Sequence, residues 1–123
     1  MSEVPDKLFL EDLKIGQMFR SGAHQVRAEE IKRFANEFDP QPFHLDETEA
    51  EQSLFHGLAA SGWHTASITM RLLVESVPLA GGIVGANVDE LRWWTPVRPG
   101  DVLRRKARSW KSSRGFPSEG WRS

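Results

Sequence analysis

The sequence contains no cysteine, which excludes disulfides, thiolate nucleophiles and cysteine metal ligands. No apolar run approaches the roughly 20 residues that a membrane-spanning helix needs, and the first residues lack the basic start and apolar run of a signal peptide. With 123 residues, 39% of them hydrophobic and 27% charged, the chain has the composition of an ordinary globular protein. We therefore expect one soluble, cytoplasmic domain over residues 1–123, with no membrane partner.

Charge is distributed unevenly along the chain. Residues 1–100 carry nine Lys or Arg against fifteen Asp or Glu, whereas residues 101–123 carry seven against two. A basic C-terminal segment can contact phosphates, but the aromatic and basic pattern of a known nucleic-acid module does not accompany it. We interpret the segment as solvated and expect no nucleic-acid partner.

Several kinds of site lack their sequence signatures. The four histidines, His24, His44, His56 and His64, form no HxxxH or HxxEH pattern, so no metal site is predicted. Ser61 stands in AASGW, which is not the GxSxG setting of a serine nucleophile. Neither GxGxxG nor a P-loop occurs, and we expect no cofactor.

Hydrophobic periodicity and turn residues predict a chain of mixed helices and strands. The expected elements are a strand over 18–26, a helix over 28–38, a short helix starting near Asp46, a long buried helix over 58–77, and strands over 83–97 and 102–109. Pro40 and Pro42 should end the first helix by Asp39 and keep residues 39–43 extended and stiff. The last stretch, KSSRGFPSEGWRS, has no usable periodicity.

The segment FDPQPFHLDE, residues 38–47, contains the most chemically suggestive pair of residues. Asp39 and His44 stand five residues apart on a segment stiffened by two prolines. A carboxylate and an imidazole that face one cavity can position a water, take its proton and deliver a proton to a substrate. Partial burial should raise the pKa of Asp39 toward the working pH. The alternative is a turn followed by a histidine without a catalytic role.

Gly57 precedes the long predicted helix, whose first residues are small. Backbone N–H groups at a helix N-terminus are unpaired and carry positive partial charge, so they can stabilise a developing oxyanion. A glycine also lets a substrate carbonyl approach closely, although a flexible entry to the helix is the alternative. Trp93 and Trp94 are interpreted as core residues that also line a cavity.

These segments together resemble the MaoC-like dehydratase family, which includes the (R)-specific enoyl-CoA hydratases. Its hydratase motif has an Asp, a short Asn/Gln-Pro segment, a His and then Leu/Val-Asp, matched here by Asp39, Gln41-Pro42, His44 and Leu45-Asp46. The resemblance continues through SLFHGLAASGWHTASITMRLL and LRWWTPVRPGDVL, so it covers about residues 10–105.

The resemblance implies an α+β hot-dog fold, in which a curved antiparallel sheet wraps a long central helix, and pairing as a homodimer. It implies an acyl-CoA substrate, with Asp39 and His44 activating one water for addition to the 2,3 double bond of an enoyl-CoA. Gly57 would contact the thioester carbonyl through its N–H, and Thr65 would supply a supporting hydroxyl.

The resemblance also implies two further alternating strands where this sequence has the atypical tail 106–123. We therefore expect a truncated or aberrant C-terminus and a sheet that lacks strands. A hot-dog acyl-CoA thioesterase and a non-catalytic acyl-CoA-binding or assembly module remain alternative functions.

Overall fold

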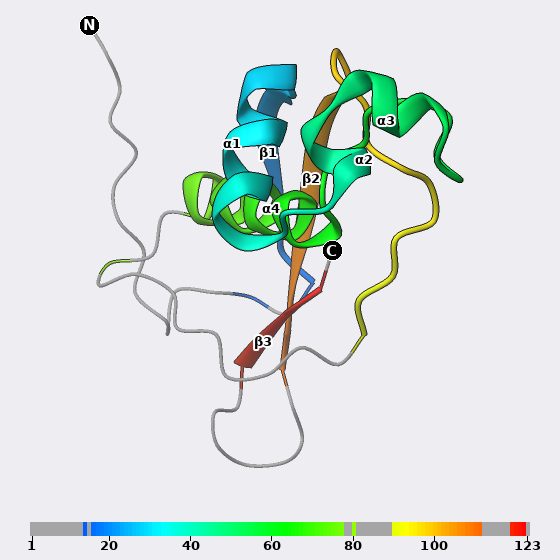
Figure 1. Cartoon of the computed structure of the whole chain (residues 1–123). Helices are drawn as coiled ribbons and strands as arrows, with labels where there is room; N and C mark the ends of the chain where they lie inside the picture. Colours follow the sequence, from blue (N-terminus) through cyan, green and yellow to red (C-terminus); the bar gives the residue numbers. More distant parts are fainter. Residues whose placement is uncertain (1–13, 15, 78–79, 81–89, 112–118, 123) are drawn as a thin grey trace, which may run out of the picture.

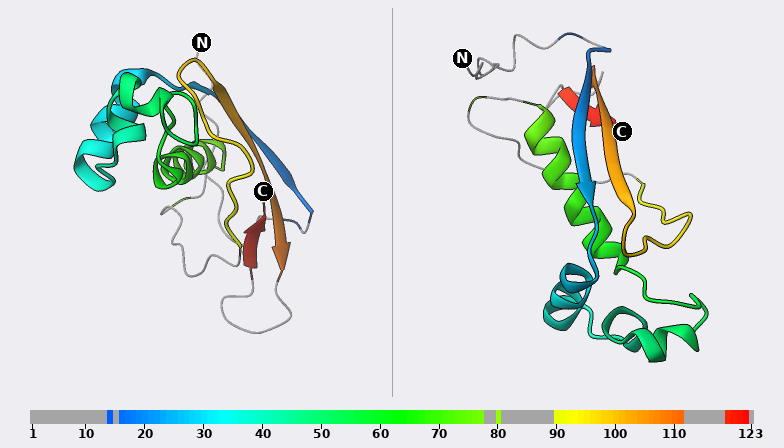
Figure 2. Two further views of the ribbon diagram at one scale, coloured as in Figure 1. Left: turned by 45° about the vertical axis from the view of Figure 1, so that its right-hand side comes forward. Right: turned by 90° about the horizontal axis from the view of Figure 1, so that it is seen from above.

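A computed structural model describes residues 14, 16–77, 80, 90–111 and 119–122. In chain order its elements are β1 (Met18–Gln25), α1 (Ala28–Phe38), α2 (Pro42–Leu45), α3 (Glu47–Glu51), α4 (Gly62–Ser76), β2 (Val102–Lys111) and β3 (Glu119–Arg122). Helix α4 packs against β1 and β2, while α1, α2 and α3 lie together at its N-terminal end (Figures 1 and 2). None of the helices in these described ranges is long and apolar enough to cross a membrane.

The three strands form one antiparallel sheet in the order β1-β2-β3. Strand β1 pairs with β2 from Met18 opposite Arg108 to Gln25 opposite Val102, and the register shifts between Arg20 and Ala23. At this shift the hydroxyl of Ser21 accepts a hydrogen bond from the amide of Arg105 at 2.7 Å. The side chain therefore satisfies a backbone donor where the strand pairing is irregular.

Burial is concentrated where the helices meet the end of β1. The cluster of buried hydrophobic side chains consists of Val26, Ile31, Ala50, Leu58, Ala60, Ile68 and Leu72. Ile31 of α1 is completely buried, and Ile68 and Leu72 come from successive turns of α4. This core fixes the short segments between α1 and α4 against the long helix.

Several predicted elements are confirmed. Helix α1 ends at Phe38, as expected from Pro40, and β1 and β2 lie where strands were predicted. Asp46 caps α3, because its carboxylate accepts a hydrogen bond from the amide of Thr48 at 2.9 Å. The expected turn at 98–101 is closed by the amide of Asp101, which donates to the carbonyl of Arg98 at 3.0 Å.

The long helix predicted over 58–77 begins later than expected, at Gly62. The amides of Ala59 and Ala60 donate to the carbonyls of Phe43 and Val97, so residues just before the helix bond to distant segments. Ser61 then caps α4, its hydroxyl accepting from the amide of Trp63 at 3.3 Å. Hydrophobic composition alone did not distinguish this buried, non-helical segment from a helical turn.

The prediction of an extended segment over 39–43 was partly wrong. Pro42 is the first residue of the single-turn helix α2, which contains His44. A proline suits that position because the first helical amide has no intrahelical acceptor in any case. The short helix directs the imidazole of His44 into the interior, where it is 4% exposed.

Three predictions outside the helices also needed correction. Residues 90–97 of the strand expected over 83–97 are not in a strand, while residues 83–89 lie outside the described residues. Trp93 and Trp94 are not core residues, because they are 45% and 81% exposed. Strand β3 lies in the tail where no element was predicted, since four residues paired with β2 are too few to show a period.

Candidate active site

Asp39 and His44 converge, although they belong to different elements. Asp39 follows the last residue of α1, and His44 lies on α2. The Nε2 atom of His44 is 3.4 Å from Oδ2 of Asp39, and the two side chains are 5% and 20% exposed. The pair is therefore largely shielded from solvent, with the carboxylate the more accessible of the two groups.

The other ring nitrogen of His44 is committed to the backbone. Nδ1 is 2.6 Å from the carbonyl oxygen of Ala59. Because a carbonyl oxygen can only accept, this contact places a proton on Nδ1 and leaves Nε2 of the neutral ring as the acceptor. The ring of Phe43 meets the imidazole edge-on at 4.7 Å, which further restricts its orientation.

Asp39 receives hydrogen bonds on both carboxylate oxygens. The hydroxyl of Ser61 donates to Oδ2 at 2.7 Å, and the side-chain amide of Gln41 donates to Oδ1 at 2.5 Å. Burial raises the pKa of Asp39, but the hydrogen bonds from Ser61 and Gln41 lower it, and the positive charge that His44 carries when its ring is protonated adds to their effect, so the net pKa is lowered. The expected rise of this pKa was therefore wrong, and Asp39 is ionised at neutral pH.

Ser61 is a member of the site that the sequence did not reveal. Its side chain is completely buried, and its hydroxyl both caps α4 and contacts Asp39. The absence of a GxSxG motif indicates only that Ser61 is not a nucleophile, and it does not bear on a hydrogen-bonding role. The available signal was a serine directly before the small and apolar start of a helix, which is a common N-cap position.

Gly57 precedes residues 58–60, which are not helical, and so does not lie at the N-terminus of α4. Its φ of +153° is one that side-chain-bearing residues rarely adopt, and His56 before it has a φ of 51°. The amide of Gly57 donates to the carbonyl of Ala50 at 3.0 Å. Any contact of this amide with a substrate oxygen must share or replace that hydrogen bond.

Thr65 lies one turn after Ser61 on α4. Its hydroxyl is 3.4 Å from the carbonyl of Ser61, and the residue is half-buried. The hydroxyl thus has a local backbone acceptor, and Ser61 rather than Thr65 makes the hydrogen bond to Asp39.

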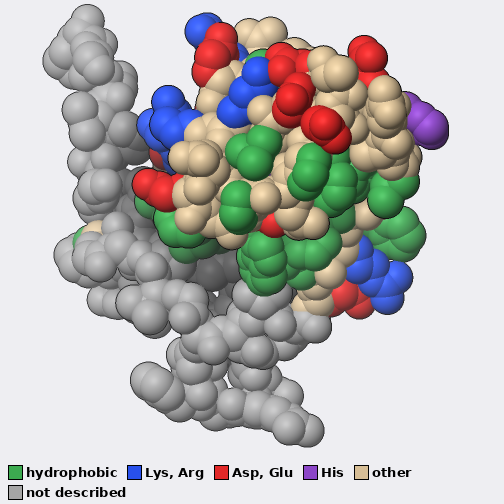
Figure 3. All heavy atoms as spheres, viewed as in Figure 1, with side chains coloured by type: hydrophobic (Ala, Val, Ile, Leu, Met, Phe, Trp, Pro, Cys, Tyr) green, Lys and Arg blue, Asp and Glu red, His purple; other side chains and the backbone are tan. Residues whose placement is uncertain are grey.

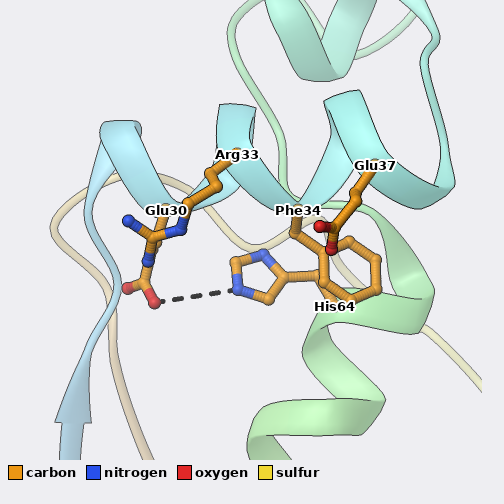
Figure 4. A pocket seen from close by; sticks show the side chains of 5 residues that line it. All are labelled: Glu30, Arg33, Phe34, Glu37 and His64. Atoms are coloured by element: carbon orange, nitrogen blue, oxygen red, sulfur yellow. Dashed lines mark ion pairs between the residues drawn. The ribbon is translucent and has the colours of Figure 1, made fainter.

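A second polar cluster joins β1, α1 and α4 (Figure 4). The carboxylate of Glu30 lies 3.1 Å from Nε2 of His24 and 3.7 Å from Nε2 of His64. Glu30 and His64 line a pocket together with Arg33, Phe34 and Glu37. Burial lowers the pKa of His64, and the nearby charge of Glu30 offsets this only in part. Burial raises the pKa of Glu30, but bonds from the Arg27 amide and His24 outweigh it, so that pKa is also lowered. His64 is therefore neutral in the folded protein near pH 7.

Among the described residues, no three His, Cys, Asp or Glu side chains are arranged to hold a metal ion. His44 and His64 face separate carboxylates, and His56 is exposed.

Comparisons with known proteins agree with this architecture. The sequence model of the family described as the MaoC like domain matches residues 12–118. The uncharacterized protein YdeM of Bacillus subtilis (strain 168) is 37% identical over 95 residues, which are 76% of this chain and 67% of that protein.

Two solved structures combine a similar fold with sequence identity. The MaoC-like dehydratase from Rhodospirillum rubrum is 62% identical with a TM-score of 0.78, over 84% of this chain and 70% of that one. The (R)-hydratase from A. caviae involved in PHA biosynthesis is 27% identical with a TM-score of 0.66, over 81% and 74% of the two chains.

The chain belongs to the MaoC-like domain family, and its fold is the α+β hot-dog fold that the sequence resemblance implied. The family match reaches residue 118, so it includes part of the tail that seemed atypical. Family and fold together support an enzyme of the hydratase or dehydratase class.

Proposed function

We propose that the protein adds water to the 2,3 double bond of a 2-enoyl-CoA, giving a 3-hydroxyacyl-CoA, and catalyses the reverse dehydration. The observation that carries this proposal is the convergence of Asp39 and His44 with one imidazole nitrogen bound to Ala59. The free nitrogen and the carboxylate are then two acceptors directed at the same space, as activation of a single water requires. The reaction calls for no metal or redox cofactor.

The environment of Asp39 suggests a division of roles between the two acceptors. The lowered pKa of Asp39 makes its carboxylate a weak base but a good hydrogen-bond acceptor, so it orients the water. Nε2 of His44 takes the proton as the O–H bond breaks and the water oxygen bonds to C3 of the substrate. The π electrons move toward C2 and the thioester oxygen, and the proton is then delivered to C2. The product gains one water, and the pair regains its starting protonation state.

Gly57 and Thr65 complete the proposed site. The thioester carbonyl would lie against Gly57 and compete with Ala50 for its amide, which is bonded at 3.0 Å without substrate. Thr65 would supply a supporting hydroxyl on the same face as Ser61. The acyl chain would follow α4, with the coenzyme A portion toward solvent.

We also propose that the protein acts as a homodimer. Large hydrophobic side chains near the site are strongly exposed in the single chain: Phe38, Leu54, Trp63, Trp93 and Trp94 are between 45% and 81% exposed. Hydrophobic side chains are visible on the surface below the charged residues that surround α1 to α3 (Figure 3). Burial of such side chains favours association.

The direct test is hydration of crotonyl-CoA, followed by loss of the enoyl-thioester absorbance. Asp39→Asn and His44→Ala should each lower kcat by about 10²- to 10⁴-fold, the range for general acid–base groups. Asp46→Asn is the matched control, because Asp46 lies on the same segment but only caps α3 through the Thr48 amide, a role that asparagine also fills.

The alternative functions predict different results in the same assay. Release of free thiol without loss of the double bond would indicate a thioesterase instead. Tight binding of acyl-CoA by folded protein, without turnover of crotonyl-CoA or longer enoyl thioesters, would indicate a binding module. Full hydratase activity in both Asp39→Asn and His44→Ala would disprove the assigned mechanism.

A further inference from the structure

Arg98 connects a distant turn to the segment that carries Gly57. Its guanidinium donates to the carbonyl of Phe55 through Nη2 and to that of Leu58 through Nη1, the latter at 3.4 Å. The two carbonyls lie on either side of Gly57, so one planar group spans the segment. A guanidinium suits this task because its donors have a fixed fork geometry.

Gly57 and Arg98 are also fitted to each other sterically. A Cβ atom on residue 57 would lie 2.9 Å from Nη1 of Arg98, closer than real Cβ contacts. The absence of a side chain therefore allows the guanidinium to lie against the backbone here. With His56 at a φ of 51° and Gly57 at +153°, the segment has an unusual backbone conformation that needs support from its surroundings.

The turn that carries Arg98 is itself anchored. The amide of Arg98 donates to Oδ2 of Asp101 at 2.9 Å, and the amide of Gly100 donates to the carbonyl of Val26 at 2.7 Å. The amide of Ala60 donates to the carbonyl of Val97 at 2.8 Å. Arg98 thus extends from a turn that is bonded both to the end of β1 and to the segment before α4.

The segment held by Arg98 leads directly to His44. Ala59, next to Leu58, accepts the hydrogen bond from Nδ1 of His44 at 2.6 Å and donates its amide to Phe43 at 3.2 Å. At the other end, the ring of Phe55 packs edge-on against Phe43 at 5.1 Å. Displacement of residues 55–59 would therefore change the orientation of the imidazole as well as the position of Gly57.

We propose that Arg98 is a positioning residue for the reaction: by binding the carbonyls of Phe55 and Leu58 it fixes residues 55–59, and through them His44 and Gly57. Arg98 does not touch the reacting atoms in this assignment. The inference rests on the proposed function for its catalytic consequence, whereas its structural content can be measured without any activity.

The catalytic test compares Arg98→Ala with Arg92→Ala, a control in the same region whose guanidinium contacts Glu90 and Trp94. Arg98→Ala should lower kcat for crotonyl-CoA by about 100-fold, because misplacement by about 1 Å can cost that much. Guanidinium chloride, well below denaturing concentrations, should restore activity at least several-fold relative to equal sodium chloride. Arg98→Lys should remain impaired, since one ammonium does not reproduce the fork. Arg92→Ala should stay within 2-fold of the wild type.

The structural test is amide hydrogen exchange in the same variants. Arg98→Ala should exchange faster at Gly57 and Ala59, whose amides bond to Ala50 and Phe43, with little change inside α4. If the wild type is inactive, the proposed function is refuted. The exchange measurement can then still show that Arg98 fixes residues 55–59. Unchanged exchange at these amides would overturn the inference. Faster exchange throughout α4, together with a loss of activity that guanidinium does not restore, would also overturn it.

Discussion

Replacement of Ser61 by alanine should have two separable effects, because one buried hydroxyl makes two hydrogen bonds. Loss of the N-cap interaction with Trp63 costs about 1 kcal/mol. Loss of the hydrogen bond to the Asp39 carboxylate costs about 1.5 kcal/mol, which is the low end of the range for hydrogen bonds to charged groups. The low value applies because this carboxylate is 20% exposed and water can reach it. We therefore expect Ser61→Ala to lower the free energy of unfolding by about 2.5 kcal/mol.

The first effect is the loss of stability. Urea unfolding measures it, provided that the dependence of the free energy of unfolding on urea concentration keeps the same slope. Ser67→Ala is the matched control, because this exposed serine on the same helix makes only a local bond to the carbonyl of Trp63. Its effect should stay within about 0.5 kcal/mol, as for most surface substitutions.

The second effect concerns the pKa of Asp39. The hydroxyl of Ser61 is one of the groups that lower this pKa, so its removal should raise the pKa. A carbon-13 NMR titration of the Asp39 carboxyl group should show this higher pKa in Ser61→Ala, and Ser67→Ala should leave the pKa in place. A stability equal to that of Ser67→Ala, together with an unchanged pKa of Asp39, would refute the assigned role of Ser61.

Two further predictions test the rest of the structure. Folding lowers the pKa of His64 from its ordinary value of 6.5, so near and below that pH the unfolded chain binds more protons than the folded chain. The free energy of unfolding should therefore fall as the pH decreases from 7 to 5. Urea titrations over this range should show a smaller loss for His64→Gln. Gly62→Ala should lower the free energy of unfolding by about 1–3 kcal/mol, because the added Cβ atom would lie 2.7 Å from the indole of Trp93. An unchanged melting temperature would instead show that the indole moves aside freely.

Much of the local structure followed from the sequence because its causes are local. Pro40 disfavours helix in the residue before it, so the end of α1 near Asp39 could be located from one dipeptide. Asp46 could be recognised as a helix cap, since a cap is a contact between near neighbours. The Asp39 and His44 motif stood out because chemistry and spacing both restrict which residues can occupy it.

The exact start of α4 could not be predicted, because it depends on distant partners. Residues 58–60 have a composition suited to a helix, but the amides of Ala59 and Ala60 bond to Phe43 and Val97. Trp93 was expected in the core on grounds of hydrophobicity. Its indole instead packs against Gly62 from outside and donates to that residue's carbonyl at 2.8 Å.

The sequence by itself determined the family and the helical and strand character of most segments, and it pointed to the acid and the histidine that we propose activate water. Only the tertiary structure decided how these groups are tuned. The protonation of Asp39 depends on Ser61, which is 22 residues away in sequence, and the orientation of His44 depends on Ala59, 15 residues away. Burial and hydrogen bonding set a pKa through atoms within a few ångströms, and which atoms come that close is a property of the folded chain.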